Sequence, residues 1–180
     1  DKVGFTGSSA VGAEIGELCG RHLQSPCLEL GGKNPLVVMD DADLDLAVDG
    51  IVWSAFGTAG QRCTAASRVI VHRAVYDELQ SKLVARAEAM RIGAPWEDDT
   101  DIGPVINETA VEKIDSYTQI GKDDGATLLT GGEIADDGDL AKGFYYRPTI
   151  FGDVEHGMRI AQEEIFGPTL SLIRFRDEAE

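Results

Sequence analysis

The sequence predicts an α/β fold with a largely parallel sheet, and two observations lead to this prediction. Short apolar runs, which are typical of strands, alternate with segments in which apolar residues recur every three to four positions, as on one face of a helix. The alternation continues along the whole chain, without internal repeats or low-complexity segments. With 180 residues, 43% of them hydrophobic, the chain is long enough to bury a core.

The first 32 residues predict a strand, a helix and a second strand. Residues 3–6 read as a short buried strand, and residues 7–12 as a glycine-containing turn into a helix that Ser8 or Ser9 can cap. Residues 27–30 form the second strand, which ends in two glycines. A glycine turn between a strand and a helix can direct free backbone N–H groups at an anion, although a plain connection would look the same.

The middle of the chain predicts two strands, each followed by a helix. Residues 35–39 are continuously apolar, which indicates a strand covered on both faces. A helix follows from Ala42, and its apolar side consists of Leu44, Val48, Ile51, Val52 and Ala55. Residues 68–72 form the next strand, and residues 75–92 a long helix.

The last part of the chain continues the alternation with shorter elements. A polar loop over 93–101 leads to a helix capped by Asn107. The remaining expected elements are a strand over 126–129, an acidic loop over 131–142, and strands over 144–150 and 170–175.

Cys63 is the first candidate for chemistry, because it lies between an amphipathic helix and a strand, where reactive groups are often found. Gly57 and Gly60 allow the chain to turn sharply before it. Arg62 places a cation next to the sulfur, and a cation favours the nucleophilic thiolate. The alternative is that Cys63 is a small buried apolar residue, as most free cysteines are.

Glu29 is the second candidate, because it is a carboxylate inside a short apolar strand. We expect it to be partly buried, and burial raises the pKa of a carboxylate toward the range that suits a general base. A glutamate that faces solvent at the end of a strand is an equally good interpretation of the same residues.

Charge and cysteine content exclude several classes of protein. The net charge of −16 and a pI of about 4.4 disfavour nucleic acids and anionic membranes as partners. No apolar run approaches the roughly 20 residues of a membrane span, and no signal-peptide pattern opens the sequence. Three cysteines argue against a disulfide framework and favour the cytoplasm. The scattered histidines predict no metal site, and the ragged ends indicate a fragment of a longer protein.

Five stretches together resemble the aldehyde dehydrogenase superfamily, and they occur in the family's order: residues 5–12, 28–33, 60–63, 102–104 and 163–168. Glu29 precedes Cys63 by 34 positions, which matches the family's spacing between base and nucleophile. The resemblance implies a three-layer fold with a mostly parallel sheet between helices. It also implies that residues 1–32 end a dinucleotide-binding domain and that residues 33–180 begin a catalytic domain that is incomplete at its C-terminus.

The resemblance further implies that an aldehyde is oxidised to a carboxylic acid with NAD or NADP. Cys63 would attack the aldehyde and carry a thioester, and Glu29 would activate the water that hydrolyses it. The residues that would bind the cofactor are Gly7, Ser8, Gly12, Leu30, Gly31, Glu164 and Phe166. The family's asparagine at the oxyanion and its lysine at the adenosine ribose have no counterpart in these 180 residues, so the fragment alone is expected to be inactive.

Partners and substrate are expected from the same resemblance. A small metabolic aldehyde such as a semialdehyde would be the substrate, and the full-length protein would form a homo-oligomer. One alternative is a non-catalytic fragment or a structural relative. A cysteine hydrolase is a weaker alternative, because no histidine lies in a recognisable partner motif.

Overall fold

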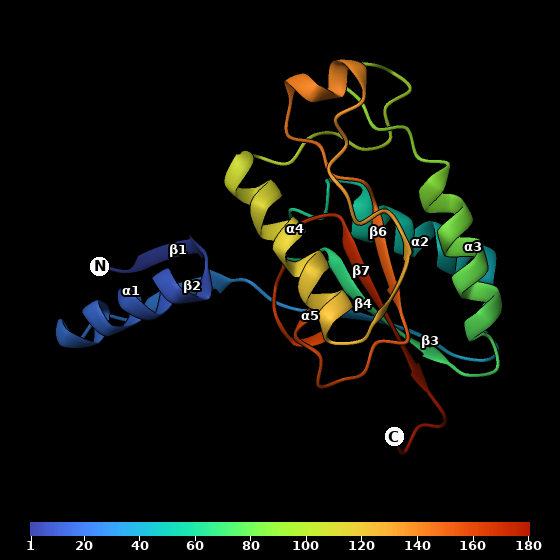
Figure 1. Ribbon diagram of the computed structural model, residues 1–180. Coiled ribbons are helices and arrows are strands. Elements are labelled where there is room, and N and C mark those ends of the chain that lie inside the picture. Colours follow the sequence, from blue (N-terminus) through green and yellow to red (C-terminus); the bar gives the residue numbers. More distant parts are fainter. The chain divides into compact units, whose positions relative to one another are not determined.

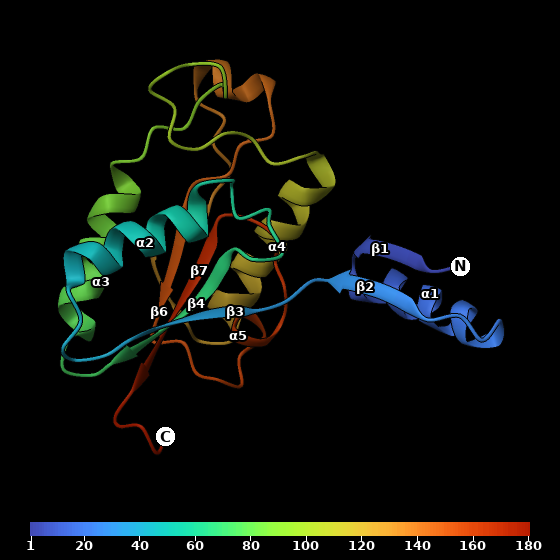
Figure 2. The ribbon, with the colours of Figure 1, turned by 180° about the vertical axis from the view of Figure 1, so that it is seen from behind.

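The computed structural model describes residues 1–180, and the chain divides into two compact units, residues 1–32 and residues 33–180. Each unit is described by itself. Figures 1 and 2 show the elements of both units from opposite sides. No helix is long and apolar enough to cross a membrane.

The first unit consists of two parallel strands and one helix. Strand β1 (Val3–Gly7) pairs with β2 (Pro26–Leu30), and helix α1 (Ser9–Arg21) connects them. Ser8 caps α1, because its side chain accepts a hydrogen bond from the Val11 backbone N–H at 3.3 Å. The expectation that the first strand is buried was wrong: exposed and half-buried residues alternate in both strands, because a two-stranded sheet has one covered face.

The second unit contains a five-stranded sheet in the order β3-β4-β7-β6-β5. Four of these strands run parallel, and β5 pairs with β6 in the antiparallel sense. The strands are β3 (Asn34–Val38), β4 (Ala66–His72), β5 (Thr127–Thr130), β6 (Thr149–Gly152) and β7 (Thr169–Phe175). The helices are α2 (Leu44–Phe56), α3 (Tyr76–Glu88), α4 (Glu108–Asp123) and α5 (Arg159–Gln162), together with the 3-10 helix η1 (Gly138–Lys142).

Helices lie on both faces of this sheet, which gives three layers. Helices α2 and α3 lie on one face, and α4 and α5 lie on the other (Figures 1 and 2). The apolar side expected for the helix after Ala42 is confirmed, because Val48, Ile51, Val52 and Ala55 are buried. The predicted α/β fold with a mostly parallel sheet between helices is therefore confirmed.

Some element boundaries differ from those expected. The strand predicted over 144–150 is wrong in position, because β6 begins only at Thr149 and Tyr146 makes a single bridge with Ile134. Pro148 has no N–H to donate to a sheet, so regular pairing begins after it. The long helix ends at Glu88 instead of residue 92, and the acidic loop contains η1.

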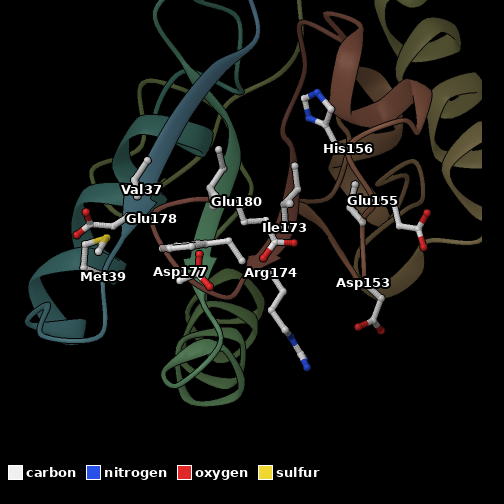
Figure 3. Close-up of a pocket in the computed structure, with 13 residues that line it drawn as sticks. Val37, Met39, Asp153, Glu155, His156, Ile173, Arg174, Asp177, Glu178 and Glu180 are labelled. Carbon is white, nitrogen blue, oxygen red and sulfur yellow. The ribbon is translucent and has the colours of Figure 1, made fainter.

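The face that α5 covers is open over the carboxyl ends of the central strands. Val37, Ile70 and Ile173 lie opposite one another on β3, β4 and β7 and form an apolar row. They line a cavity of about 790 Å³ with Met39, Phe175 and several acidic residues (Figure 3). The prediction that residues 35–39 are covered on both faces is therefore wrong, since Val37 is 59% exposed.

Candidate active site

Three neighbouring parallel strands bring the predicted site residues of the second unit to one edge of its sheet. Cys63 lies three residues before β4, residues 163–168 directly precede β7, and Lys33 directly precedes β3. Because β3, β4 and β7 are adjacent and parallel, their amino ends meet at the same edge. The cysteine and the Glu-Glu-Ile-Phe-Gly-Pro segment are thereby brought close together, although about 100 residues separate them.

The cysteine loop (residues 57–65) begins where α2 ends. Gly57 closes the helix by donating its backbone N–H to the Trp53 carbonyl at 3.0 Å. The chain then turns through two left-handed residues, Ala59 at φ +51° and Gly60 at φ +67°. Ala59 is buried, whereas Cys63 is exposed, so the loop packs its turn into the protein and presents the sulfur at the surface.

Asn34 and Ser54 fix the loop on the strand side. The Asn34 amide donates hydrogen bonds to the carbonyl oxygens of Cys63, at 2.5 Å, and of Ala65, at 3.0 Å. The Ser54 hydroxyl accepts a hydrogen bond from the Ala66 backbone N–H at 3.1 Å. The main chain from Cys63 to Ala66 is therefore held by side chains from β3 and α2.

Gln61 links the loop to a second family stretch. Its Oε1 accepts a hydrogen bond from the Ile106 backbone N–H at 2.8 Å, and its Nε2 donates to the Pro104 carbonyl at 3.4 Å. The Ile-Gly-Pro stretch at residues 102–104 therefore leads into the segment that supports the cysteine loop.

Gly60 links the loop to the Glu-Glu-Ile-Phe-Gly-Pro segment. A Cβ atom at residue 60 would lie 2.0 Å from the Gly167 carbonyl oxygen, so the two main chains touch where no side chain fits. Gly167 is in turn closely covered by the Ile114 side chain of α4. The stretches that resembled the family within the second unit therefore converge on one loop.

Arg62 binds the loop to α2. Its guanidinium lies 4.5 Å from the centre of the Trp53 ring and donates a hydrogen bond to the Ser54 carbonyl at 3.5 Å. A cation over an indole face is an attractive contact. These contacts hold the loop against α2, and the expected effect of Arg62 on the sulfur stays a prediction.

Glu164 and Phe166, predicted to bind the cofactor, lie in the segment that leads to β7. The Lys113 ammonium group donates a hydrogen bond to the Glu164 carbonyl at 2.9 Å. Phe166 adopts a left-handed backbone conformation at φ +63°, and 41% of it is exposed. Ile165 between them is buried, so the segment is anchored while its two neighbours are partly accessible.

The first unit holds the remaining predicted residues. Gly7 and Ser8 are exposed at the amino end of α1, whose first turn has no acidic side chain. Gly12 lies against β2, where an added Cβ would come within 2.5 Å of the Leu30 side chain. A helix start without acidic side chains favours an anion, and the role of these residues at a cofactor stays a prediction.

Glu29 differs from the expectation, because it is exposed on β2. The prediction that it is partly buried was wrong, since the strand has one face against α1 and Glu29 lies on the other. Glu29, Leu30 and Gly31 belong to the first unit, and the pairing of Glu29 with Cys63 stays a prediction.

The cavity of Figure 3 lies at the opposite edge of the sheet, at the carboxyl ends of β3, β4 and β7. Ligands of open α/β sheets commonly bind at carboxyl ends. No predicted site residue lines this cavity, whereas the amino edge carries the exposed thiol and its supports. We therefore assign the candidate site to the amino edge.

Sequence reasoning did not find the supports of the cysteine loop. Asn34 and Gln61 both lie inside stretches quoted for the resemblance or directly beside them, and this proximity was the only available signal. Their partners are 29 to 45 residues away along the chain, and no local pattern reports such a contact.

Comparison with known proteins shows the family to which the chain belongs. The model of the Aldehyde dehydrogenase family matches residues 1–180, and the chain belongs to this family. The chain is 46% identical over 181 residues to 1-pyrroline-5-carboxylate dehydrogenase of Bacillus subtilis (strain 168), covering 97% of this chain and 34% of the relative. It is 45% identical over 177 residues to the mitochondrial aldehyde dehydrogenase of Homo sapiens, covering 98% of this chain and 34% of the relative.

A solved structure gives the same result. The betaine aldehyde dehydrogenase (betB) of Staphylococcus aureus in complex with NAD+ aligns with a TM-score of 0.97 and 38% sequence identity, covering 100% of this chain and 36% of that one. The chain therefore spans about a third of the length of these relatives.

Proposed function

We propose that the protein oxidises an aldehyde to a carboxylic acid with NAD or NADP as the hydride acceptor, through a thioester on Cys63. The observation that carries this proposal is an exposed cysteine on a loop that four separate segments fix: β3 through Asn34, α2 through Ser54, residues 104–106 through Gln61, and Gly167 through Gly60. A nucleophile must be accessible and precisely placed, and this loop meets both conditions.

The chain's own residues would act in two stages. The Cys63 thiolate attacks the aldehyde carbon, and the Cys63 backbone N–H donates a hydrogen bond to the oxyanion that forms. The nicotinamide ring of the bound cofactor supplies an acceptor for the hydride that leaves this carbon. Glu29 then takes a proton from water as the water attacks the Cys63 thioester, and the thiolate departs as the acid is released.

The residues proposed to bind the cofactor are those that the family resemblance implies. Gly7, Ser8 and Gly12 at the start of α1 would hold the pyrophosphate, and Leu30 and Gly31 would approach the nicotinamide. Glu164 would accept hydrogen bonds from the nicotinamide ribose, with Phe166 beside it. The NAD+ named for the Staphylococcus aureus structure supports a dinucleotide as the ligand.

We propose a semialdehyde or another small metabolic aldehyde as the substrate. The name of the Staphylococcus aureus structure, a betaine aldehyde dehydrogenase, supports a small aldehyde as the substrate. A panel of aldehydes assayed with NAD and with NADP on the full-length protein would determine both choices.

Replacing the nucleophile tests the reaction. Cys63→Ala in the full-length protein should abolish NADH formation, because no thiolate remains to attack the aldehyde. Cys27→Ser is the matched control, since Cys27 is also exposed and has no role in the proposal. Normal NADH formation in Cys63→Ala would contradict the proposal.

The role of Glu29 is tested by pre-steady-state kinetics. Glu29→Gln should retain a burst of NADH and then stop, because acylation of Cys63 proceeds while hydrolysis of the thioester is blocked. Intact-mass measurement should detect the acyl adduct, and Glu14→Gln on the exposed side of α1 serves as the control. Loss of the burst with normal cofactor binding would count against a role limited to deacylation.

A further inference from the structure

Glu163, directly before the proposed ribose ligand, has no part in the reaction described above, yet two other side chains hold its carboxylate. Arg159 holds its carboxylate with both ends of the guanidinium fork, from Nε to Oε1 at 2.9 Å and from Nη2 to Oε2 at 2.9 Å. The Tyr117 hydroxyl donates a third hydrogen bond to Oε2 at 2.6 Å. Three donors from two helices therefore fix one side chain.

Helix α4 also holds the main chain of the next residue. Lys113 lies one turn before Tyr117, and its ammonium group donates to the Glu164 carbonyl at 2.9 Å. Two cations lie near the Tyr117 ring, with the Lys113 Nζ 5.9 Å and the Arg159 Cζ 5.6 Å from its centre. The side chain of Glu163 and the backbone of Glu164 are thus fixed by one face of α4.

The charges in this cluster persist across the physiological range. The Arg159 guanidinium, and then the Tyr117 hydroxyl, lower the pKa of Glu163 to about 2. Burial, and then the hydrogen bond to Glu163, raise the pKa of Tyr117 above its usual value. Glu163 therefore stays ionised and Tyr117 stays protonated, so the three hydrogen bonds do not depend on pH near neutrality.

The other end of the segment is fixed as well. Ile165 is 3% exposed, and Gly167 lies between the Ile114 side chain of α4 and the backbone of Gly60. Phe166 is left-handed between these anchors, a conformation that costs free energy for a residue with a side chain. The surroundings must impose this conformation. On the amino side of Phe166, the anchor is the group formed by Tyr117, Arg159 and Glu163.

We propose that Tyr117, Arg159 and Glu163 are positioning residues that fix the backbone of residues 164–166 in the conformation that binds the cofactor. This inference rests on the proposed function, since it requires that Glu164 contacts the nicotinamide ribose. The cluster acts through Glu164 and Phe166 and does not itself touch the cofactor.

The experiment measures NAD binding to full-length Tyr117→Phe and Glu163→Gln by calorimetry and by quenching of tryptophan fluorescence. Loss of one or more hydrogen bonds to the ionised Glu163 should raise the Kd for NAD about threefold to tenfold. The KM for NAD should rise in parallel, while the KM for the aldehyde stays within about twofold. Arg159→Lys keeps the charge and loses the fork, so it should give a smaller increase in Kd than Glu163→Gln.

Tyr146→Phe is the matched control, because it also removes a tyrosine hydroxyl that bonds to α4, at Asp115 and Thr118, away from Glu163. It should lower thermal stability and leave the Kd for NAD unchanged. Equal weakening of NAD binding by Tyr146→Phe and Tyr117→Phe would overturn the inference, because the effect would then be one of general stability.

Glu164→Gln separates this inference from the proposed function. If Glu164→Gln leaves NAD binding unchanged, the assignment of Glu164 to the ribose is wrong. If Glu164→Gln weakens binding while Tyr117→Phe and Glu163→Gln do not, the proposed function stands and the positioning role is overturned.

Discussion

Lys33 is unusual among the residues around the site, because its ammonium group is buried without a hydrogen-bonding partner. Burial is the main cause that lowers its pKa to about 8, and repulsion by Arg68 is the next. Glu164 and Glu163 act in the opposite direction without restoring the ordinary value of 10.5. At neutral pH the folded protein therefore carries a cation that its surroundings disfavour.

The stability of the protein should depend on this cation. Between pH 8 and 10.5 the folded state loses the Lys33 proton while the unfolded state keeps it, so the free energy of unfolding should rise with pH in this window. Lys33→Met should remove this contribution. Urea unfolding of the wild-type protein and of Lys33→Met at several pH values separates the Lys33 contribution from those of other titrating groups. If the difference between their free energies of unfolding does not change with pH, the prediction is wrong.

At the level of residues, the position of Cys63 on a loop could be predicted from the sequence, and the contacts that support this loop could not. Cys63 became a candidate because it follows a glycine turn between a helix and a strand, and such a junction is visible locally. Asn34 and Tyr117 act on residues that the fold brings to them from 29 and 46 positions away along the chain. For Glu29 the sequence left burial and exposure as equal alternatives, because an apolar strand sequence does not reveal which of its faces is covered.

Among the elements, the cysteine loop depends most on a single backbone position. The structure places two requirements on residue 60. Its backbone is left-handed at φ +67°, and a Cβ atom would collide with the Gly167 carbonyl. At Gly138 only the first requirement applies, since its backbone is left-handed at φ +58° but the space around its Cα is open.

These two glycines make a matched pair for mutation. Gly138→Ala should cost about 1 to 2 kcal/mol, the strain of a left-handed residue with a side chain. Gly60→Ala adds a collision with backbone atoms and should cost about 3 to 5 kcal/mol. Chemical denaturation measures the free energy of unfolding of both variants. Similar decreases for the two would show that the contact with Gly167 does not contribute to stability.

Hydrophobic periodicity predicted which segments are helices and which are strands. The residues at which these elements begin and end depend on tertiary contacts. The helix capped by Asn107 is confirmed, because the Ala110 backbone N–H donates a hydrogen bond to the Asn107 Oδ1 at 2.9 Å. The prediction of a strand over 144–150 rested on three consecutive aromatic residues, which have strand propensity. It was wrong in position, because Tyr145 and Tyr146 are buried outside the sheet ladder.

For the molecule as a whole, the apolar row of Val37, Ile70 and Ile173 is the least expected feature. Strands in the middle of a parallel sheet are ordinarily covered on both faces. Here α5 approaches only the amino side, where the Ser171 hydroxyl donates to the Ile160 carbonyl at 3.3 Å. The row therefore leaves apolar surface in contact with water.

This surface should bind an environment-sensitive apolar dye under native conditions when the 180-residue chain is studied. Val37→Thr should reduce the fluorescence of the bound dye and change the free energy of unfolding by no more than about 1 kcal/mol, because threonine retains β-branching. Leu46→Thr is the control, since Leu46 is 73% exposed on α2 and outside the row. Equal dye binding by all three proteins would contradict the prediction.

The backbone contact between Gly60 and Gly167 constrains the number of residues in the cysteine loop more than the identity of their side chains. Two main chains in contact are insensitive to the identity of flanking side chains, so positions such as Thr58 and Thr64 can vary. An insertion of one residue between Gly60 and Cys63 would keep every side chain and still displace the sulfur by a full residue's length. Deletions and insertions, rather than replacements, should therefore be absent from this stretch in active descendants of the protein.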